Sequence, residues 1–443
     1  MHDFVEPQVG DSRMRANSPS VKPPRSEVHP LRPSIDNFWL RNKRGAAREL
    51  VSLATAVMLL LGTFAPTTSL GSVLPGDLVD GATAPSRHLD EQAMPDVTLR
   101  EGALFDGEGR VLWARDPDTR RPMASITKIM TAIVALEHSS PNDIVTVPRE
   151  AITVGQSSAG LIAGEKLTMF ELLEALLVKS GNDAAVAIAV HVGGSQDEFV
   201  AMMNRKAADL GLADTHFANP HGLDAPNHYT TADNLAVLAR YAMTKPTFAD
   251  IVRRSKVTIG KGKRRRTLLS TDLLLGVYKG AIGVKTGNTD GAGYSVVSAA
   301  QRQGVTLYAV VLGTKSDRQR FVDAKALLDW GFAHYRPMQL ADRGTIVAEA
   351  PVSSYLDRSV QVVVSQDTTV PILDLEGSIK RTVSVSAIPA PVTKGQQLGV
   401  ATFRQGSRVV ATVPLVATED VGRPNPFETV WVATVRLWQR IFG

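Results

Sequence analysis

The chain has 443 residues, of which 44% are hydrophobic and 21% charged, as in a folded protein of two or three domains. It contains no cysteine, which excludes disulfides, zinc–thiolate sites and a cysteine nucleophile. Much of the positive charge lies in the N-terminal tail and in the run Lys261–Arg266, for which we expect a solvated hairpin or loop. Neither has the interleaved aromatic residues of a nucleic-acid-binding surface, so no nucleic-acid partner is expected.

The N-terminal segment has features of an export signal. Residues 1–48 are rich in Pro, Arg, Ser and Asn without a sustained apolar period, which predicts a disordered tail. Basic residues between 41 and 48 then precede an apolar run in 49–66, an order that directs the following chain to export. Because a bilayer span needs about 20 apolar residues, the run fits a signal-peptide core or a marginal membrane anchor. A buried soluble helix is the remaining alternative.

Residues 96–336 carry the pattern of one compact domain. The expected strands lie at 103–105, 111–113, 292–300 and 305–312, and the expected helices follow Ser125, Thr168, Ser195 and Arg320. Two of these helices have the sequence of a capping box, Thr168–Glu171 and Ser195–Glu198. Since helices separate the early strands from the late ones, we expect antiparallel pairing and an α+β fold.

The rest of the chain changes character. Residues 338–416 contain short β-rich runs between Gly, Pro, Asp and Ser, which predict a small all-β domain without catalytic features. Residues 425–443 place Trp431, Trp438 and other apolar residues at helical spacing, with a basic edge. That pattern predicts an amphipathic helix lying on an anionic membrane surface. Packing of this helix onto the β domain is the alternative.

Three short motifs carry the chemistry. Ser125-Ile126-Thr127-Lys128 opens a helix, where residues three apart share a face, so an amine stands beside a serine that needs a base. Ser180-Gly181-Asn182 is expected in the turn after a helix that ends near Gly181, and Lys285-Thr286-Gly287 follows later. The set S-x-x-K, S-x-N and K-T-G in this order is typical of penicillin-binding proteins and β-lactamases.

With these motifs the chain resembles the D-alanyl-D-alanine carboxypeptidases, the low-molecular-mass penicillin-binding serine peptidases of bacterial cell-wall metabolism. Further blocks similar to the family lie at 157–161, 177–185, 217–223 and 283–287. The resemblance implies a β-lactamase/transpeptidase-like domain, with an antiparallel sheet flanked by helices, before the β domain and the terminal helix. It also implies a peptidoglycan stem peptide as substrate, β-lactam antibiotics as covalent inhibitors and no metal or other cofactor. The expected location is the outer face of the cytoplasmic membrane.

The resemblance also implies roles for the first two motifs. Ser125 would attack the carbonyl between two D-alanines, and Lys128 would accept its proton. That role requires a neutral amine, so burial and the charge of Lys285 must depress the pKa of Lys128 below its usual value of ~10.4. Ser180 would relay the proton to the leaving amine, and Asn182 would hold Lys128 and the substrate amide.

Lys285 and Thr286 would bind the terminal carboxylate of the substrate, and Gly287 would let the substrate lie alongside the strand. The backbone N–H groups of Ser125 and Asn288 would form the oxyanion hole. Asn288 stands where many relatives carry histidine, which leaves the backbone role intact.

Two further groups allow more than one interpretation. Arg320 matches an arginine that helps to bind the carboxylate in relatives, or it is an exposed residue at a helix start. His216, His221 and His228 lie close in sequence. A metal site is conceivable there, but no H-E-x-x-H pattern supports one, and a structural role in the loop is expected.

Other activities use the same fold. A β-lactamase is disfavoured because its deacylating glutamate in an E-x-x-x-N loop is missing: Glu198 is the only glutamate between Asn182 and Lys285, and Met202 follows it at the asparagine position. A D,D-endopeptidase acting on peptidoglycan cross-links would use the same residues. A non-catalytic penicillin-binding protein remains a third alternative.

Overall fold

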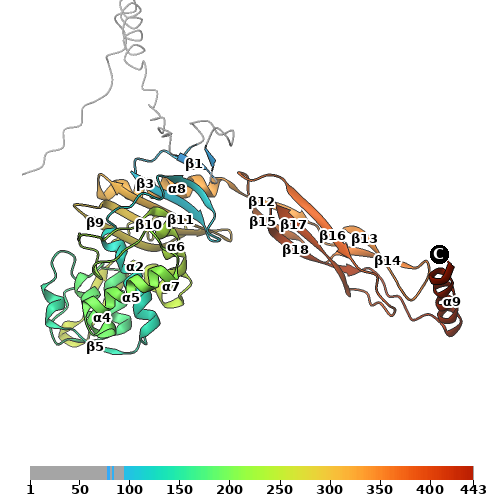
Figure 1. Cartoon of the computed structure of the whole chain (residues 1–443), viewed down its shortest axis with the longest axis horizontal. Helices are drawn as coiled ribbons and strands as arrows, with labels where there is room; N and C mark the ends of the chain where they lie inside the picture. The colour runs from blue at the N-terminus through green and yellow to red at the C-terminus, as the bar shows by residue number, and fades with distance from the viewer. Residues whose placement is uncertain (1–76, 80–81, 84–93, 443) are drawn as a thin grey trace, which may run out of the picture. The chain divides into compact units, whose positions relative to one another are not determined.

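The structure, a computed structural model, describes residues 77–79, 82–83 and 94–442 (Figure 1). The predictions of a disordered tail at 1–48 and of a signal or anchor at 49–66 lie outside these residues. The chain divides into two units, 1–67 and 68–443, and all described residues belong to the second.

The first domain is built on a seven-stranded sheet (Figure 1). In spatial order its strands are β2 (Ala82–Thr83), β1 (Asp77–Val79), β4 (Val111–Arg115), β3 (Glu101–Asp106), β11 (Val305–Thr314), β10 (Gly293–Arg302) and β9 (Ala281–Thr289). Every neighbouring pair is antiparallel. The predicted antiparallel α+β fold is therefore confirmed.

Side chains of the central strands alternate between two apolar cores, one on each face of the sheet. Ala103 and Phe105 belong to the larger core, whereas Leu104 between them belongs to the smaller core under α8 (Asp317–Ala333). Six helices contribute side chains to the larger core: α2 (Lys128–His138), α3 (Met169–Leu177), α4 (Asn182–Gly193), α5 (Gln196–Asp209), α6 (Ala232–Met243) and α7 (Pro246–Val252).

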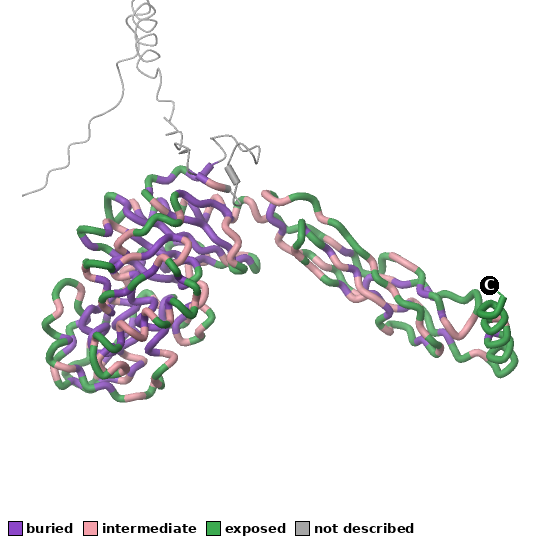
Figure 2. The backbone as a smooth tube through the Cα atoms, in the orientation of Figure 1, coloured by how far each residue is buried: buried purple, intermediate pink, exposed green. Residues whose placement is uncertain are grey.

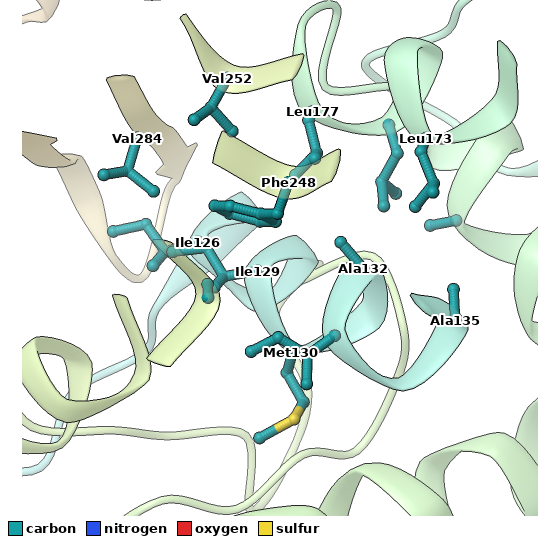
Figure 3. Packing of buried hydrophobic residues seen from close by; sticks show 14 of the residues in the cluster. Ile126, Ile129, Met130, Ala132, Ala135, Leu173, Leu177, Phe248, Val252 and Val284 are labelled. Carbon is teal, nitrogen blue, oxygen red and sulfur yellow. The ribbon is translucent and has the colours of Figure 1, made fainter. Parts of the chain in front are cut away.

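Helix α2 lies inside this larger core. Every residue from Lys128 to Ala135 is buried, so the helix has no solvent-exposed face over two turns. Ile129 and Met130 pack among apolar side chains of the surrounding helices, as Figure 3 shows. A side chain placed at the start of α2 is therefore held by close packing on all sides.

Short elements lie at the edges of the domain. They are the 3-10 turns η3 (Ala124–Thr127), η4 (Arg149–Thr153) and η5 (Gly262–Arg264) and the hairpins β5 (Ile144–Thr146) with β6 (Lys166–Thr168) and β7 (Lys256–Ile259) with β8 (Arg266–Leu269). Residues 261–265 of the basic run form the exposed connection between β7 and β8, as the sequence predicted. Arg266 instead is the half-buried first residue of β8, and its guanidinium pairs with Glu165.

The capping box at Thr168 and Glu171 opens α3 as predicted, with both reciprocal hydrogen bonds present. The prediction that Asn182 lies in a turn was wrong. After α3 the chain turns within four residues, and Asn182 is the first residue of α4. The alanine-rich stretch that follows favours a helix. Because this helix is buried on all sides, its sequence lacks the amphipathic period from which a helix is usually predicted.

The second domain is all-β, as predicted. A two-stranded sheet pairs β12 (Tyr335–Ala341) with β15 (Thr368–Leu373), and a five-stranded sheet has the order β13 (Ile346–Pro351), β14 (Ser359–Val364), β18 (Arg408–Ala417), β17 (Gln397–Gln405) and β16 (Ile379–Val385). Valine-rich strands such as β14 supply its separate apolar core.

The chain continues into α9 (Pro426–Phe442), which is exposed along nearly its whole length (Figure 2). Its exposed large apolar residues lie at helical spacing along one face. These are Phe427, Val430, Trp431, Leu437, Trp438, Ile441 and Phe442. In α9, Val432 alone is buried, so the alternative that the apolar face packs on the β domain is wrong. Within the described ranges, no helix combines the length and the apolarity that crossing a bilayer requires.

Candidate active site

Ser125 is the second residue of η3, and this turn leads directly into α2. Side chains three residues apart eclipse one another in a 3-10 turn, which brings Ser125 and Lys128 together. The Lys128 Nζ atom lies 2.7 Å from Ser125 Oγ. Ser125 is half-buried, so its hydroxyl remains accessible at the edge of a tightly packed helix.

Lys128 is fully buried, and its amine contacts three oxygen atoms. Besides Ser125 Oγ, Nζ donates to Asn182 Oδ1 at 2.7 Å and to the His221 carbonyl at 2.5 Å. Burial lowers the pKa of Lys128 well below its usual value, and the charge of Lys285 adds to this effect. A neutral amine has two hydrogens and one lone pair, so donation to these two carbonyl-type oxygens directs the lone pair at Ser125.

Asn182 is held in turn by the loop before β6. Its Nδ2 donates to the Gly155 carbonyl at 2.8 Å, and its backbone N–H donates to the Ser157 carbonyl at 2.8 Å. The neighbouring Asp183 carboxylate accepts hydrogen bonds from Ser158 Oγ and from the N–H groups of Ala159, Leu161 and Ala184. Asp183 thus ties the loop to the start of α4 and fixes Asn182.

The second and third motifs also meet. Lys285 Nζ donates to Ser180 Oγ and to the Thr286 carbonyl, each at 2.8 Å. Lys285 lies in the middle of β9 and is buried, and burial together with the charge of Arg320 lowers its pKa to about 7. Ser180 occupies the left-handed region with φ of 64°, in the four-residue turn between α3 and α4.

The remaining K-T-G residues position β9 against the nucleophile turn. A Cβ at Gly287 would lie 3.0 Å from Ala124 Cβ and 3.1 Å from the Ser125 nitrogen, so a side chain there would push the nucleophile turn by a few tenths of an ångström. The Thr286 hydroxyl lies 2.6 Å from that of Thr271. The Asn288 side chain is exposed.

Arg320 does not lie exposed at a helix start. Only 6% of it is accessible, and its Nη1 donates to the Gly287 carbonyl at 2.8 Å and to the Ser295 carbonyl at 3.2 Å. Its Nη2 pairs with Asp317 at the start of α8. The guanidinium therefore links β9 to β10 at the K-T-G motif through these two carbonyls.

The histidine loop has structural contacts. His216 Nδ1 lies 2.6 Å from the Asn227 carbonyl, and His221 Nδ1 accepts from the Leu223 N–H. Among the residues that the structure describes, no group of three His, Asp or Glu side chains could hold a metal ion.

Two parts of the chain match known families. Residues 92–316 match peptidase S11, described as D-alanyl-D-alanine carboxypeptidase, and residues 335–423 match the penicillin-binding protein 5 C-terminal domain. The chain belongs to the D-alanyl-D-alanine carboxypeptidase family. The resemblance drawn from the three motifs is confirmed.

Relatives of this carboxypeptidase family match most of the chain. The D-alanyl-D-alanine carboxypeptidase DacF of Bacillus subtilis is 32% identical over 75% of this chain and 87% of its own. DacC of Escherichia coli is 31% identical over 81% and 94%. The crystal structure of penicillin-binding protein 5 from Haemophilus influenzae, 29% identical, covers 74% of this chain and 99% of its own, with a TM-score of 0.55.

Sequence reasoning missed some residues at this carboxypeptidase-family site. Asp183 could have been suspected, because it follows the S-x-N motif directly. Asp272 gave no such indication. It is buried, its charge opposes the lowering of the Lys285 pKa, and burial raises its own pKa. Thr127 was also missed, although it lies inside the first motif, whereas His228 was expected to have a structural role in its loop.

Proposed function

We propose that this protein is a serine D-alanyl-D-alanine carboxypeptidase that removes the terminal D-alanine from peptidoglycan stem pentapeptides through an acyl-enzyme on Ser125. The observation that carries the proposal is the buried Lys128 amine, 2.7 Å from Ser125 Oγ, with its pKa well below the usual value. A neutral amine at hydrogen-bonding distance is what a serine needs to become a nucleophile.

In acylation, Ser125 Oγ attacks the carbonyl between the two D-alanines while its proton passes to Lys128 Nζ. The oxyanion accepts hydrogen bonds from the backbone N–H groups of Ser125 and Asn288. Collapse of the tetrahedral intermediate breaks the peptide bond. Ser180 passes its proton to the leaving amine and takes up in its place the proton that Lys128 holds. The Ser180–Lys285 hydrogen bond of 2.8 Å supports this relay, because it orients the hydroxyl.

In deacylation, water attacks the ester carbon and gives its proton to Lys128, which is neutral again once the first proton has left with D-alanine. Asn182 keeps the amine in place through its 2.7 Å contact and, we infer, also binds the substrate amide. When the ester C–O bond breaks, Lys128 returns the proton taken from water to Ser125 Oγ, which restores the hydroxyl and leaves the amine neutral. The same lysine thus serves both halves of the reaction.

The terminal carboxylate of the substrate would be bound by Lys285 and Thr286, with Arg320 stabilising it at longer range. Since a lysine is charged only below its pKa, the value of about 7 for Lys285 predicts a pH effect. We expect kcat/KM to fall by up to about tenfold per pH unit above pH 7, through a rise in KM. Steady-state kinetics of D-alanine release from pH 5 to 9 would measure it.

A matched control separates this effect from the titration of other groups. A substrate that ends in a carboxamide has no negative charge for Lys285 to bind, so its kcat/KM should lack the alkaline fall. A carboxylate substrate whose kcat/KM keeps rising to pH 9 would contradict the role given to Lys285.

The function is tested by incubating the purified chain with a peptide that ends in D-Ala-D-Ala and measuring free D-alanine. We expect release that benzylpenicillin abolishes, with one penicilloyl group bound per chain. A penicilloylated protein that releases no D-alanine, yet cleaves D,D-cross-linked dimers, would be an endopeptidase. Penicilloylation with neither activity would indicate a non-catalytic penicillin-binding protein, and fast penicillin hydrolysis would indicate a β-lactamase.

We also propose that the protein acts in the cell envelope, exported and attached to the outer face of the cytoplasmic membrane through α9. Support comes from the exposed apolar face of that helix, which includes Trp431 and Trp438, beside the basic residues Arg436 and Arg440. Aromatic residues and a basic edge suit the interface of an anionic bilayer.

We expect the double substitution Trp431→Glu and Trp438→Glu to weaken binding to anionic vesicles by roughly 100-fold, because burial of each indole is lost and charge is added. Co-sedimentation with phosphatidylglycerol vesicles would measure it. The matched control is Thr429→Glu with Gln439→Glu, which adds the same charge away from the apolar face. Equal loss in both pairs would favour simple charge repulsion over insertion of the tryptophans.

A further inference from the structure

Beneath Ser125 lies a buried chain of hydrogen bonds that the mechanism above does not use. The Ala218 N–H donates to His228 Nδ1 at 2.9 Å, His228 Nε2 lies 2.7 Å from Thr127 Oγ1, and Thr127 Oγ1 donates to the Ala124 carbonyl at 2.8 Å. Both His228 and Thr127 are buried. The last acceptor of this hydrogen-bond network is the carbonyl of Ala124, the residue directly before the proposed nucleophile.

We propose that His228 and Thr127 are positioning residues that orient the backbone N–H of Ser125 toward the oxyanion of the reaction. The proposal rests on the function proposed above, and it gives a task to a histidine outside the three motifs.

The direction of each hydrogen bond follows from the two ends of the network, the Ala218 N–H and the Ala124 carbonyl. A backbone N–H can only donate, so His228 Nδ1 is the acceptor and the proton of the neutral ring is on Nε2. Nε2–H therefore donates to Thr127 Oγ1, and the single hydroxyl hydrogen of Thr127 is directed at the Ala124 carbonyl. Burial, with a smaller effect of His216, lowers the pKa of His228 to about 4, so this neutral arrangement persists at neutral pH.

The Ala124 carbonyl belongs to the same peptide unit as the Ser125 N–H, the donor to the oxyanion. The C=O of Ala124 and the N–H of Ser125 lie in one rigid plane and point in opposite directions. Fixing the carbonyl therefore fixes the direction of the N–H. Donation to a carbonyl oxygen also polarises its peptide, which makes the N–H a better donor.

The backbone at this position is strained and tightly enclosed. Ala124 has φ of 49°, in the left-handed region that non-glycine residues rarely adopt, so the surrounding contacts must maintain it. Gly222 lies directly against the Ala124 carbonyl, since a Cβ there would be only 2.0 Å from the oxygen. Within the described residues the Ser125 N–H has no hydrogen-bond acceptor, so it is free for a substrate oxygen.

The test compares His228→Leu, Thr127→Val and the double variant with the wild-type chain. Each removes the donor to the Ala124 carbonyl or the group that orients it. We expect kcat for D-alanine release and the rate of penicillin acylation to fall by 10- to 100-fold, with KM within twofold. Because both residues act through one carbonyl, the double variant should be no slower than the slower single variant.

Two further variants keep the test independent of folding. His228→Gln carries an NH2 group that can still donate to Thr127, so it should keep at least a fifth of the wild-type acylation rate. His216→Leu removes an exposed histidine of the same loop and should change neither kcat nor KM. Affinity for a peptide boronic acid, which forms a tetrahedral adduct on the serine, should fall by the same factor as kcat.

Other results would overturn the inference. One such result is an unchanged acylation rate in Thr127→Val. Another is a double variant whose loss of rate equals the product of the two single losses, and a third is a rise in KM without a fall in kcat. The acylation rate is measured apart from D-alanine release, so the inference can be tested even where the carboxypeptidase activity fails. A wild-type chain that benzylpenicillin does not acylate would overturn both proposals together.

Discussion

Replacing Ser125 with alanine is expected to abolish D-alanine release and penicilloyl labelling together, with a fall in kcat on the order of 10⁶-fold. The methyl group leaves no atom that can form the ester, and the neutral Lys128 then has no nucleophile to activate. The change removes one oxygen from a half-buried position, so the fold should persist. Mass spectrometry after exposure to benzylpenicillin, beside an assay of D-alanine, measures both effects.

The structure provides a specific competitor to this assignment. Ser180 also contacts a buried lysine, because Lys285 Nζ lies 2.8 Å from its Oγ. Ser125 is favoured because it is the more accessible serine: Ser125 is half-buried, whereas Ser180 is buried. A penicilloyl group that persists in Ser125→Ala and maps to Ser180 would reverse the two roles.

The parts of the fold that depend on local pattern were predictable. The strands near Leu104 alternate their side chains between two cores, and the Thr168–Glu171 capping box begins α3 as its sequence indicates. The Ser125–Lys128 contact was predictable for the same reason, since it joins residues three apart at a helix start.

Contacts between distant segments were not predictable from the residues alone. Nothing in the local sequence places Lys285 against Ser180, 105 residues earlier, because that contact depends on how β9 passes the α3–α4 turn. Family resemblance supplied the grouping of the three motifs but not its geometry. Arg320 is an example. Its position near the start of a polar helix gave no indication that it is buried and donates a hydrogen bond to the Gly287 carbonyl of β9.

Some features become visible only in three dimensions. The left-handed backbone at Ala124 has no local cause such as glycine, and it follows from packing against Gly222 and β9. Gly287 was expected to make room for substrate, but the structure gives it a second task, because a side chain there would press on the nucleophile turn. Both findings concern the direction of the Ser125 N–H, which sequence patterns do not encode.

The second large effect is expected for Lys128→Gln. A glutamine amide can still donate to Asn182 Oδ1 and to the His221 carbonyl, so the buried acceptors keep a partner. Its nitrogen has no basic lone pair, and loss of the general base should slow penicillin acylation by about 10⁴-fold. Stopped-flow acylation measures the rate, and an unchanged thermal midpoint shows that the fold is intact.

The matched control for this prediction is Lys179→Gln, which changes the lysine beside the second motif. Its Nζ is outside the contacts described for Ser125, so acylation should stay within twofold of the wild-type rate. The wild-type rate should also fall as pH decreases, because protonation removes the lone pair of Lys128. A Lys128→Gln variant that keeps a tenth of the wild-type rate would contradict the role of Lys128 and point to Lys285 as the base. The two lysines can be told apart because only Lys128 donates to two carbonyl-type oxygens in a way that leaves its lone pair directed at Ser125.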